Sequence, residues 1–404
     1  MIKKILILGA GIEQALAICE AKRLGYFVIA CDADPEAVGF SNADVSHVID
    51  IKNKHEVEGI AKEHSVDGIF SHAVEIPDIV ATVATKLGLP CLHPDVASRA
   101  TNKKSRITYL KNNAIPCADF RFVETTGQLE GAASEIGFPL VIKPVDNAGS
   151  RGVSLVSDET GLEHAYAEAT RYSSEEGVLL EERLSGPEVS TESVVYKGEI
   201  HTFAFADRNY VRPEVFSPYF IEDGINYPST LPEDIRKAVY ELVEKTIRVL
   251  GIDFGAAKGD VIIDKGVPKI IEMAARTSGG WFGAGSIPAA TGVNMLKPLL
   301  QMAVGDEPDL DALKPTRNLG CAQRYIIPTE GGVVRAITGV EEAKFMPGVV
   351  MFSMFLPEIG STIRRATNHA ERYGQIICTG ATREEAIRRC EEAINTIRIE
   401  LDEC

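Results

Sequence analysis

The stretch that decides the fold is VIKPVDNAGSRGV, residues 141–153, in which a lysine closes an apolar run and a loop of small residues follows. Gly149 and Gly152 let backbone N–H groups of this loop approach an anion closely and let the loop move. Lys143 adds a positive charge at the base of the loop. The pattern is not a Walker loop, because the lysine precedes the glycines. From these residues alone, a phosphate-binding loop and a plain surface hairpin between two strands are equally good predictions.

Composition restricts the class of protein. The chain has 404 residues, 45% of them hydrophobic and 25% charged, which is typical of a globular protein with two or three packed units. The formal net charge of -16 disfavours a nucleic-acid partner, because binding to a polyanion depends on lysine and arginine. The apolar run near the N-terminus is too short for a signal peptide or a membrane span, so we expect a cytoplasmic protein that is not bound to a membrane. The eight cysteines form no CxxC pair and predict neither a zinc site nor a disulfide framework.

The order of periodic segments predicts an α/β chain with an α+β C-terminal part. Residues 1–95 alternate strands (4–9 first) with helices (13–24 first), as in a doubly wound parallel sheet of Rossmann type. Residues 96–308 form a second α/β and α+β region, with a small lobe at about 118–190. Within it we expect a helix over 159–172, a hairpin turning at Lys197-Gly198 and a helix over 232–251. Residues 309–404 predict a smaller α+β unit, closed by a helix over 383–401.

A second candidate site lies in KGDVIIDKGVPKIIEMAARTSGG, residues 258–280, where two β-rich segments carry Asp260 and Glu272. Side chains alternate along strands, so a connection of three or five residues centred on Gly266 places the two carboxylates directly opposite each other. In that arrangement they can share a hard cation. A two-residue turn at Lys265-Gly266 would instead place them on opposite faces, as two exposed acids.

The residues after Glu272 favour phosphoryl chemistry. Arg276 offers a planar fork for a carboxylate or a phosphoryl group, and Ser278, Gly279 and Gly280 offer backbone N–H groups beside it. A metal ion, an arginine and N–H donors are the parts that phosphoryl transfer requires.

Two further stretches are weaker signals. In VLLEERLSGPEVSTE, residues 178–192, a strand ends in Glu181 and Glu182, and Leu184 can pack on a flat base while Glu188 reaches sugar hydroxyls. Charged strand ends of this kind are commonly just solvated. Near the N-terminus, GAGIEQ invites a dinucleotide site, but Gln14 stands where the third glycine of that fingerprint is required. An NAD-dependent oxidoreductase is therefore a minor alternative.

Taken in order, the helix with Lys103, VIKP with its glycine loop, EERLSGPE, and a hairpin with two acids ending in EMAAR resemble the ATP-grasp superfamily. The resemblance covers essentially the whole chain, and it implies a nucleotide clamped between two α+β lobes. The N-terminal Rossmann-like unit corresponds to the pre-ATP-grasp domain of these enzymes, and the C-terminal lobe is like that of biotin-carboxylase-like members.

The resemblance implies roles for individual residues. The loop is expected to be a lid over the β- and γ-phosphates, and the implied ATP-binding residues are Lys103, Lys143, Asn147, Gly149, Ser150, Gly152, Glu181, Glu182, Leu184 and Glu188. Asp260 and Glu272 match the Mg²⁺ carboxylates, with Mn²⁺ as an alternative ion. The implied catalytic residues are Lys143, Arg276, Ser278, Gly279 and Gly280.

Two features depart from the family pattern. The frequent E-x-N-x-R reads EMAAR here, so Ala274 supplies no amide oxygen for a second metal ion. Lys258, two residues before Asp260, stands where several relatives carry histidine.

The implied reaction is ATP-dependent, ADP-forming carboxylate-amine ligation through an acyl phosphate. The segments around 206–235 and 272–294 look most like ligases that act on amino acids and similar small acids, with Arg208, Tyr210, Arg212 and Gly11 as candidate substrate residues. Trp281 is expected either to wall the acceptor pocket or to lie in the core. The partners are a small carboxylate and an amine, and relatives are often homodimers. The alternatives are a biotin-carboxylase-like or nucleotide-precursor carboxylase that activates bicarbonate, and a non-catalytic ATP-binding protein.

Overall fold

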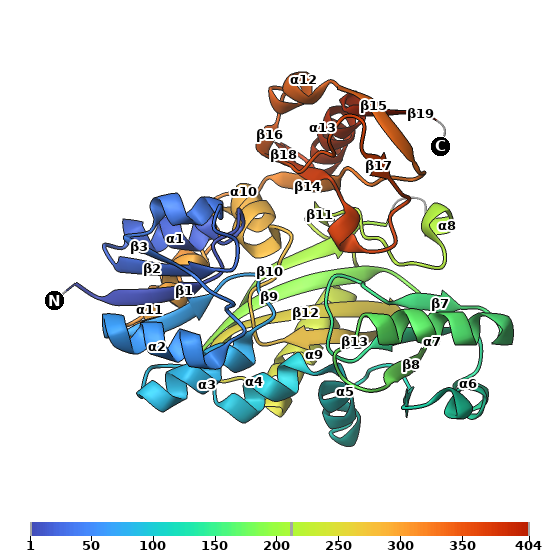
Figure 1. Cartoon of the computed structure of the whole chain (residues 1–404), viewed down its shortest axis with the longest axis horizontal. Coiled ribbons are helices and arrows are strands. Elements are labelled where there is room, and N and C mark those ends of the chain that lie inside the picture. The colour runs from blue at the N-terminus through green and yellow to red at the C-terminus, as the bar shows by residue number, and fades with distance from the viewer. Residues whose placement is uncertain (1, 211–212, 403–404) are drawn as a thin grey trace.

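The computed structural model describes residues 2–210 and 213–402, and the strands of this part of the chain form four sheets (Figure 1). The N-terminal sheet is parallel, as predicted, with strand order β3-β2-β1-β4. Its strands are β1 (Lys4–Leu8), β2 (Phe27–Asp32), β3 (Val45–Val48) and β4 (Gly68–Ser71). The accompanying helices are α1 (Ala15–Arg23), α2 (Lys54–His64) and α3 (Pro77–Leu87). The loops after β1 and β4 point toward the centre of the molecule.

Residues 118–182 build a lobe with its own antiparallel sheet, of order β5-β8-β6-β7. Helices α4 (Pro94–Thr101) and α5 (Lys103–Asn112) precede this lobe and pack in the main core of the molecule. The strands of the lobe are β5 (Phe120–Val123), β6 (Leu140–Pro144), β7 (Ser154–Val156) and β8 (Val178–Glu182). Helices α6 (Leu129–Ile136) and α7 (Leu162–Arg171) pack on this sheet around a core that includes Leu140, Ile142 and Leu180. The glycine-rich loop joins β6 to β7 and lies at the edge of this lobe.

The central sheet has eight strands in the order β13-β12-β9-β10-β11-β14-β18-β16. Their bounds are β9 (Glu188–Tyr196), β10 (Glu199–Arg208), β11 (Ile225–Tyr227), β12 (Gly255–Asp264), β13 (Val267–Ala274), β14 (Gly320–Tyr325), β16 (Val349–Met354) and β18 (Gly374–Gly380). The predicted hairpin turn at Lys197-Gly198 is confirmed, because Tyr196 pairs with Glu199. Because β11 pairs with β14, the C-terminal lobe continues this sheet.

Further helices follow in the second half of the chain. They are α8 (Pro213–Phe216), α9 (Glu233–Leu250), α10 (Ile287–Thr291), α11 (Leu296–Ala303) and, on the C-terminal strands, α13 (Arg383–Thr396). Helix α9 covers the sheet with an apolar face that includes Val239, Val243 and Ile247. Helix α11 packs on the N-terminal unit, where its residues Leu299 and Leu300 share a core with Ile5 and Ile7. This contact fixes the N-terminal loops against the central sheet.

The C-terminal lobe corrects one prediction. The closing helix was expected over 383–401, but α13 ends at Thr396 and Arg398–Asp402 form the strand β19. This strand pairs with β15 (Gly332–Thr338), which also pairs with β17 (Thr362–Ile363), and α12 (Val340–Lys344) completes the lobe. The segment RIELD alternates apolar and charged residues, as strands do. Because the edge of β15 is available for pairing, this segment forms a strand. Among the described residues, no helix combines the length and apolar character needed to cross a membrane.

The hairpin of β12 and β13 places Asp260 directly opposite Glu272, but not by the predicted route. The connection is the two-residue turn Lys265-Gly266, with positive φ at both residues, and not a longer odd loop. A bulge restores the pairing: Val261 faces Ile270, Asp260 faces Glu272, and Ile271 is the extra residue. The predicted loop of three or five residues is therefore absent, although the predicted pairing of Asp260 with Glu272 is present.

Candidate active site

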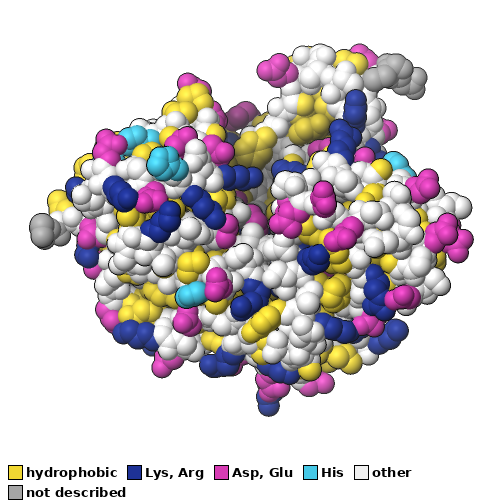
Figure 2. Space-filling view, turned by 60° about the horizontal axis from the view of Figure 1, so that its bottom comes forward, with side chains coloured by type: hydrophobic (Ala, Val, Ile, Leu, Met, Phe, Trp, Pro, Cys, Tyr) yellow, Lys and Arg dark blue, Asp and Glu magenta, His cyan; other side chains and the backbone are white. Residues whose placement is uncertain are grey.

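A cleft of about 480 Å³ lies where the lobe of residues 118–182, the central sheet and the C-terminal lobe meet. Figure 2 shows the surface hollowed between the N-terminal side of the molecule and the C-terminal lobe. Of the candidate residues that the structure describes, all but Gly11, Gly152 and Trp281 line this cleft, although they come from widely separated segments.

Gly11 is not among the residues that line the cleft, and its contact with substrate stays a prediction. The turn that contains Gly11 is filled by its own neighbours. Asp32 accepts a hydrogen bond from the backbone N–H of Ala10 at 2.7 Å, and the Gln14 side chain donates to the carbonyl of His72 at 3.0 Å. Asp32 is the acid that would have to bind the ribose of a dinucleotide, and here it is already hydrogen-bonded to Ala10.

Gly152 has a packing role instead of a place in the cleft lining. A Cβ atom at this position would lie 3.1 Å from Cβ of Tyr172 and 3.2 Å from Cα of Ala169, so glycine lets the loop pass close to α7. Arg212 lies outside the described residues. Trp281 lies in an apolar cluster with Ala290, Cys321 and Ile377, which is the core role of the two that we considered.

Two lysines lie at the base of the cleft, of which Lys143 is buried and Lys103 is half-buried. Lys143 Nζ lies 2.6 Å from Glu181 Oε2, on neighbouring strands β6 and β8, and the other Glu181 oxygen has no hydrogen-bond partner. Lys103, at the start of α5, donates to the carbonyl of Asn147 in the glycine-rich loop. Burial lowers the pKa of Lys103 to about 8. The Asn147 amide donates to the carbonyl of Tyr172 and so braces the loop.

Next to these lysines the cleft has an apolar slot. Ala118, Leu184 and Ile262 form a small cluster that lines the cleft, with Ile271 packed against it. Ile271, the extra residue of the bulge, thus contributes to the slot. Glu182 lies at its edge and pairs with Lys269 at 3.0 Å. A flat apolar surface beside an unpartnered carboxylate oxygen can accept a heteroaromatic ring that carries an amino group.

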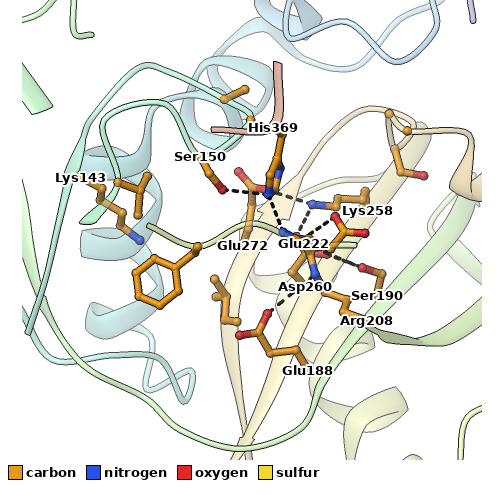
Figure 3. A pocket seen from close by; sticks show the side chains of 18 of the residues that line it. Lys143, Ser150, Glu188, Ser190, Arg208, Glu222, Lys258, Asp260, Glu272 and His369 are labelled. Carbon is orange, nitrogen blue, oxygen red and sulfur yellow. Dashed lines mark hydrogen bonds and ion pairs between the residues drawn. The ribbon is translucent and has the colours of Figure 1, made fainter. Parts of the chain in front are cut away.

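Arg208 and Tyr210 lie beside the acids of the site and not in a separate acceptor pocket. Arg208 contacts Asp260 at 2.8 Å and Glu222 at 3.1 Å (Figure 3). The Tyr210 hydroxyl donates to Glu188 Oε2 at 2.7 Å. Burial raises the pKa of Glu188, against the opposing effect of Arg208.

The paired acids meet the requirements of a magnesium site that the nucleotide completes. Both side chains face the cleft, and Asp260 Oδ1 accepts a hydrogen bond from Ser190 at 2.8 Å. No group of three or more His, Cys, Asp or Glu side chains is placed to hold a metal within 2–210 and 213–402. Mg²⁺ usually takes one or two protein carboxylates together with substrate phosphates and water. Two hard carboxylates in a cleft fit that pattern.

Positive groups surround these acids. Lys258 Nζ donates to Asp260 Oδ2 and to Glu272 Oε2, the latter at 3.0 Å. Burial alone would raise the pKa of Asp260, but Arg208 and Lys258 hold it below its usual range. Burial would likewise raise the pKa of Glu272, but Lys258 and Arg106 hold it well below. Both acids are therefore carboxylates at neutral pH.

At the far end of the cleft, the N-terminal unit holds Arg276. Glu75, in the loop after β4, accepts a hydrogen bond from Arg276 Nε. Burial would lower the pKa of Arg276, but Glu75 and Glu272 raise it, so this guanidinium stays charged. The neighbouring Thr277 hydroxyl oxygen accepts a hydrogen bond from the backbone N–H of Ala73 at 2.8 Å.

Two of the three backbone N–H groups expected to stabilise an oxyanion already have protein partners. The N–H of Ser278 donates to Glu192 at 2.7 Å, and that of Gly280 donates to Glu13 at 3.2 Å. The N–H of Trp281 also donates to Glu13, at 2.7 Å. Burial raises the pKa of Glu13 and of Glu192 to about 7. Arg276 is therefore the principal donor at this end of the cleft.

Sequence reasoning missed several residues of the cleft. They include Glu75, Glu222, Tyr325, His369 and Arg372, and all five line it. Glu75 and Glu222 stand in loops, Tyr325 ends a strand, and His369 begins a short 3₁₀ helix that Arg372 follows. Arg372 stacks over the ring of Tyr325 at 3.6 Å from its centroid, and its guanidinium donates to the carbonyl of Glu222 at 3.1 Å. No local pattern in the sequence marks these residues.

Two family models match the chain. The ATP-grasp domain matches residues 136–284, which include the glycine-rich loop and the hairpin of acids. The L-amino acid ligase C-terminal domain 2 matches residues 324–402.

Known proteins resemble the chain in fold and in part of its sequence. The crystal structure of an L-amino acid ligase from Bacillus licheniformis superposes with a TM-score of 0.85 at 23% identity, over 99% of each chain. A biotin carboxylase from Campylobacter jejuni superposes with a TM-score of 0.73 at 18% identity, over 100% of this chain and 93% of that one. A formate-dependent phosphoribosylglycinamide formyltransferase of Bacteroides fragilis is 33% identical over 41% of this chain and 43% of its own length. Residues 136–284 are therefore an ATP-grasp domain, residues 324–402 are an L-amino acid ligase C-terminal domain 2, and the whole chain has the fold of the L-amino acid ligase.

Proposed function

We propose that this protein is an ATP-dependent, ADP-forming carboxylate-amine ligase that activates an amino acid or another small carboxylic acid as an acyl phosphate. One observation carries the proposal: Lys103, Lys143, the opposed Asp260–Glu272 pair and Arg276 all line a single cleft. The cleft thus combines cations that can bind phosphates, two metal-binding carboxylates and a donor for a second reactant.

The nucleotide end fits ATP. The apolar slot at Leu184 takes the adenine ring, and the unpartnered oxygen of Glu181 accepts a hydrogen bond from its amino group. Glu188 accepts from a ribose hydroxyl. Lys103 and Lys143 hold the phosphates, and the glycine-rich loop covers them. Asp260 and Glu272 hold Mg²⁺, or Mn²⁺ as the alternative ion, which when bound offsets charge on the β- and γ-phosphate oxygens.

The proposed reaction has two steps. A carboxylate oxygen of the acid attacks the γ-phosphorus, the bond between that phosphorus and the β–γ bridging oxygen breaks, and ADP leaves. The nitrogen of the amine then attacks the acyl carbon, the bond from that carbon to the phosphate oxygen breaks, and phosphate and a proton are released. Arg276 orients the carboxylate in the first step and stabilises the oxyanion in the second. No protein nucleophile is required.

The choice of an amino acid as substrate rests on the C-terminal part. Residues 324–402 match the L-amino acid ligase C-terminal domain 2, and this segment supplies Tyr325, His369 and Arg372 to the cleft. Carboxylases that activate bicarbonate remain the second candidate, because the biotin carboxylase of Campylobacter jejuni has the same fold. The cytoplasmic location and the homodimer also remain predictions.

The test is ADP and phosphate release with magnesium and ATP across a panel of amino acids and small carboxylates, with a bicarbonate arm. Each assay is repeated with hydroxylamine, which traps an acyl phosphate as a hydroxamate. We expect ADP release that depends on one acid and a hydroxamate of that acid. The Lys143→Ala variant is the control for contaminating ATPase activity. ADP release with bicarbonate alone would favour a carboxylase, and a protein that binds ATP without releasing ADP under any condition would contradict the ligase assignment.

A further inference from the structure

Lys258 is a buried cation that bridges the two acids of the proposed metal site. Its ammonium group donates to Asp260 and lies 3.0 Å from Glu272 Oε2, and the side chain is only 11% exposed. Lys258 stands two residues before Asp260 on β12, so both side chains point to the same face of the sheet. Figure 3 shows the ammonium group of Lys258 directed toward these acids.

The register of the hairpin explains how Lys258 reaches this position. Lys258 lies directly opposite Ala274, which is fully buried. Directly opposed Cβ atoms on an antiparallel pair are roughly 5 Å apart, so a longer residue at position 274 would compete with the lysine stem for space. Alanine fills little of that space and offers no oxygen ligand. In the cross-strand pair of Lys258 and Ala274, the lysine therefore supplies a cation, and the alanine supplies no metal ligand.

The charges of these side chains determine how strongly the site binds a metal ion. Asp260 and Glu272 together carry two negative charges; Arg208 pairs with Asp260 at 2.8 Å, Arg106 pairs with Glu272 at 3.5 Å, and Lys258 contacts both acids from between them. A divalent ion that enters without a nucleotide meets an ammonium group already bound to both carboxylates. A triphosphate adds the negative charge that makes room for both the ion and the ammonium.

We propose that Lys258 is a built-in cation that limits this site to one divalent ion, which binds together with the nucleotide. The ammonium group takes the place of a second metal ion toward the triphosphate. The inference rests on the proposed nucleotide site, but it concerns a residue to which the proposed function gives no role.

The first test measures Mn²⁺ binding to nucleotide-free protein by the loss of the free Mn²⁺ signal in electron paramagnetic resonance. We expect Lys258→Met and Lys258→Gln to bind Mn²⁺ at least about tenfold more tightly than the parent, because removing a unit charge a few ångströms away strengthens binding even at a high effective dielectric constant. Lys269→Met is the matched control, since Lys269 bridges Glu182 and Asp264 on the same hairpin at 3.0 and 3.1 Å. We expect its Mn²⁺ affinity to equal that of the parent.

The second test counts Mn²⁺ ions in the complexes of the parent protein and of Lys258→Met with a non-hydrolysable ATP analogue. We expect one ion per protein in the parent and two in Lys258→Met. Two ions in the parent, or equal Mn²⁺ affinity of the nucleotide-free Lys258 variants and the parent, would overturn the proposal. If the analogue does not bind at all, the proposed function fails, while the comparison of nucleotide-free proteins still tests Lys258. Thermal unfolding of each variant checks that the fold is intact.

Discussion

His369 of the C-terminal lobe is hydrogen-bonded to Gly149 of the glycine-rich loop: its backbone N–H donates to the Gly149 carbonyl at 3.0 Å. The imidazole Nε2 also faces the Ser150 hydroxyl at 3.3 Å and accepts from the backbone N–H of Glu222 at 3.1 Å. Burial keeps the pKa of His369 well below its ordinary value, so the ring is neutral and can accept. Through these His369 contacts, which we call the latch, the C-terminal lobe holds the glycine-rich loop over the cleft.

The latch predicts the behaviour of the loop. In His369→Ala the imidazole contacts are lost, and we expect faster amide hydrogen exchange over residues 146–152 and weaker ATP binding, with the rest of the fold unchanged. Ser150→Ala removes only the hydroxyl contact and should have a smaller effect. The exposed His55, changed to Ala, is the matched control. Unchanged exchange over the loop in His369→Ala would show that the contact does not hold it.

The buried pair of Lys143 and Glu181 predicts a separation of stability from binding. Lys143→Met leaves a buried carboxylate without its partner, which typically costs about 3–5 kcal/mol of unfolding free energy. The double variant Lys143→Met/Glu181→Gln removes the lone charge, so we expect most of the stability to return while ATP binding and turnover stay lost. Denaturant unfolding and ATP titration measure the two effects. ADP production at the parent rate in either variant would show that Lys143 does not bind the phosphates.

The pairing of Asp260 with Glu272 shows what the sequence could and could not predict. The alternation of apolar and polar residues marked two strands, and DKGVP marked the turn between them. The bulge at Ile271 could not be predicted from the sequence, because IIEM has the pattern of an ordinary strand whether or not it contains an extra residue. Only the geometry of the sheet, in which β12 also pairs with β9, fixes the register that brings the two acids together.

The residues that the sequence missed share a physical cause. Glu75 acts on Arg276 across two units of the fold, and His369 reaches the glycine-rich loop from a segment more than two hundred positions away. Such contacts depend on how separate elements pack, and the spacing of residues within either segment does not indicate that packing. Likewise, RIELD at 398–402 has a pattern that suits a strand, but only the open edge of β15 decides that it becomes one.

The metal assignment makes a third prediction. Glu272→Gln keeps the size and one oxygen of the side chain but removes its charge, so we expect activity to need far higher magnesium concentrations and kcat to fall at least about a hundredfold. The melting temperature should change little, because Lys258 and Arg106 keep other acceptors in Asp260 and in the Ala100 carbonyl. Asp264→Asn is the matched control on the same hairpin. Equal activity of Glu272→Gln and the parent at limiting magnesium would contradict the assignment.

A fourth prediction concerns Glu192, whose carboxylate is fully buried against the Ser278 N–H and hydroxyl. Burial raises its pKa from 4.5 to about 7, so between these values the folded protein keeps a proton that the unfolded chain has released. Stability from this group is therefore complete below pH 4.5 and is lost as the pH rises through 7. A shift of this size corresponds to a loss on the order of 3 kcal/mol.

Glu192→Gln tests this directly. The amide is neutral at every pH, its oxygen can still accept from the Ser278 N–H, and the Ser278 hydroxyl can accept from its amino group. We expect the unfolding free energy of the parent to fall more steeply than that of Glu192→Gln between pH 5 and about pH 8, measured by urea unfolding at each pH. The exposed Glu199, changed to Gln, should follow the parent. Parallel pH profiles for the parent and Glu192→Gln would mean that the carboxyl is already ionised in the folded protein at pH 5, and that the two Ser278 hydrogen bonds outweigh the cost of its burial.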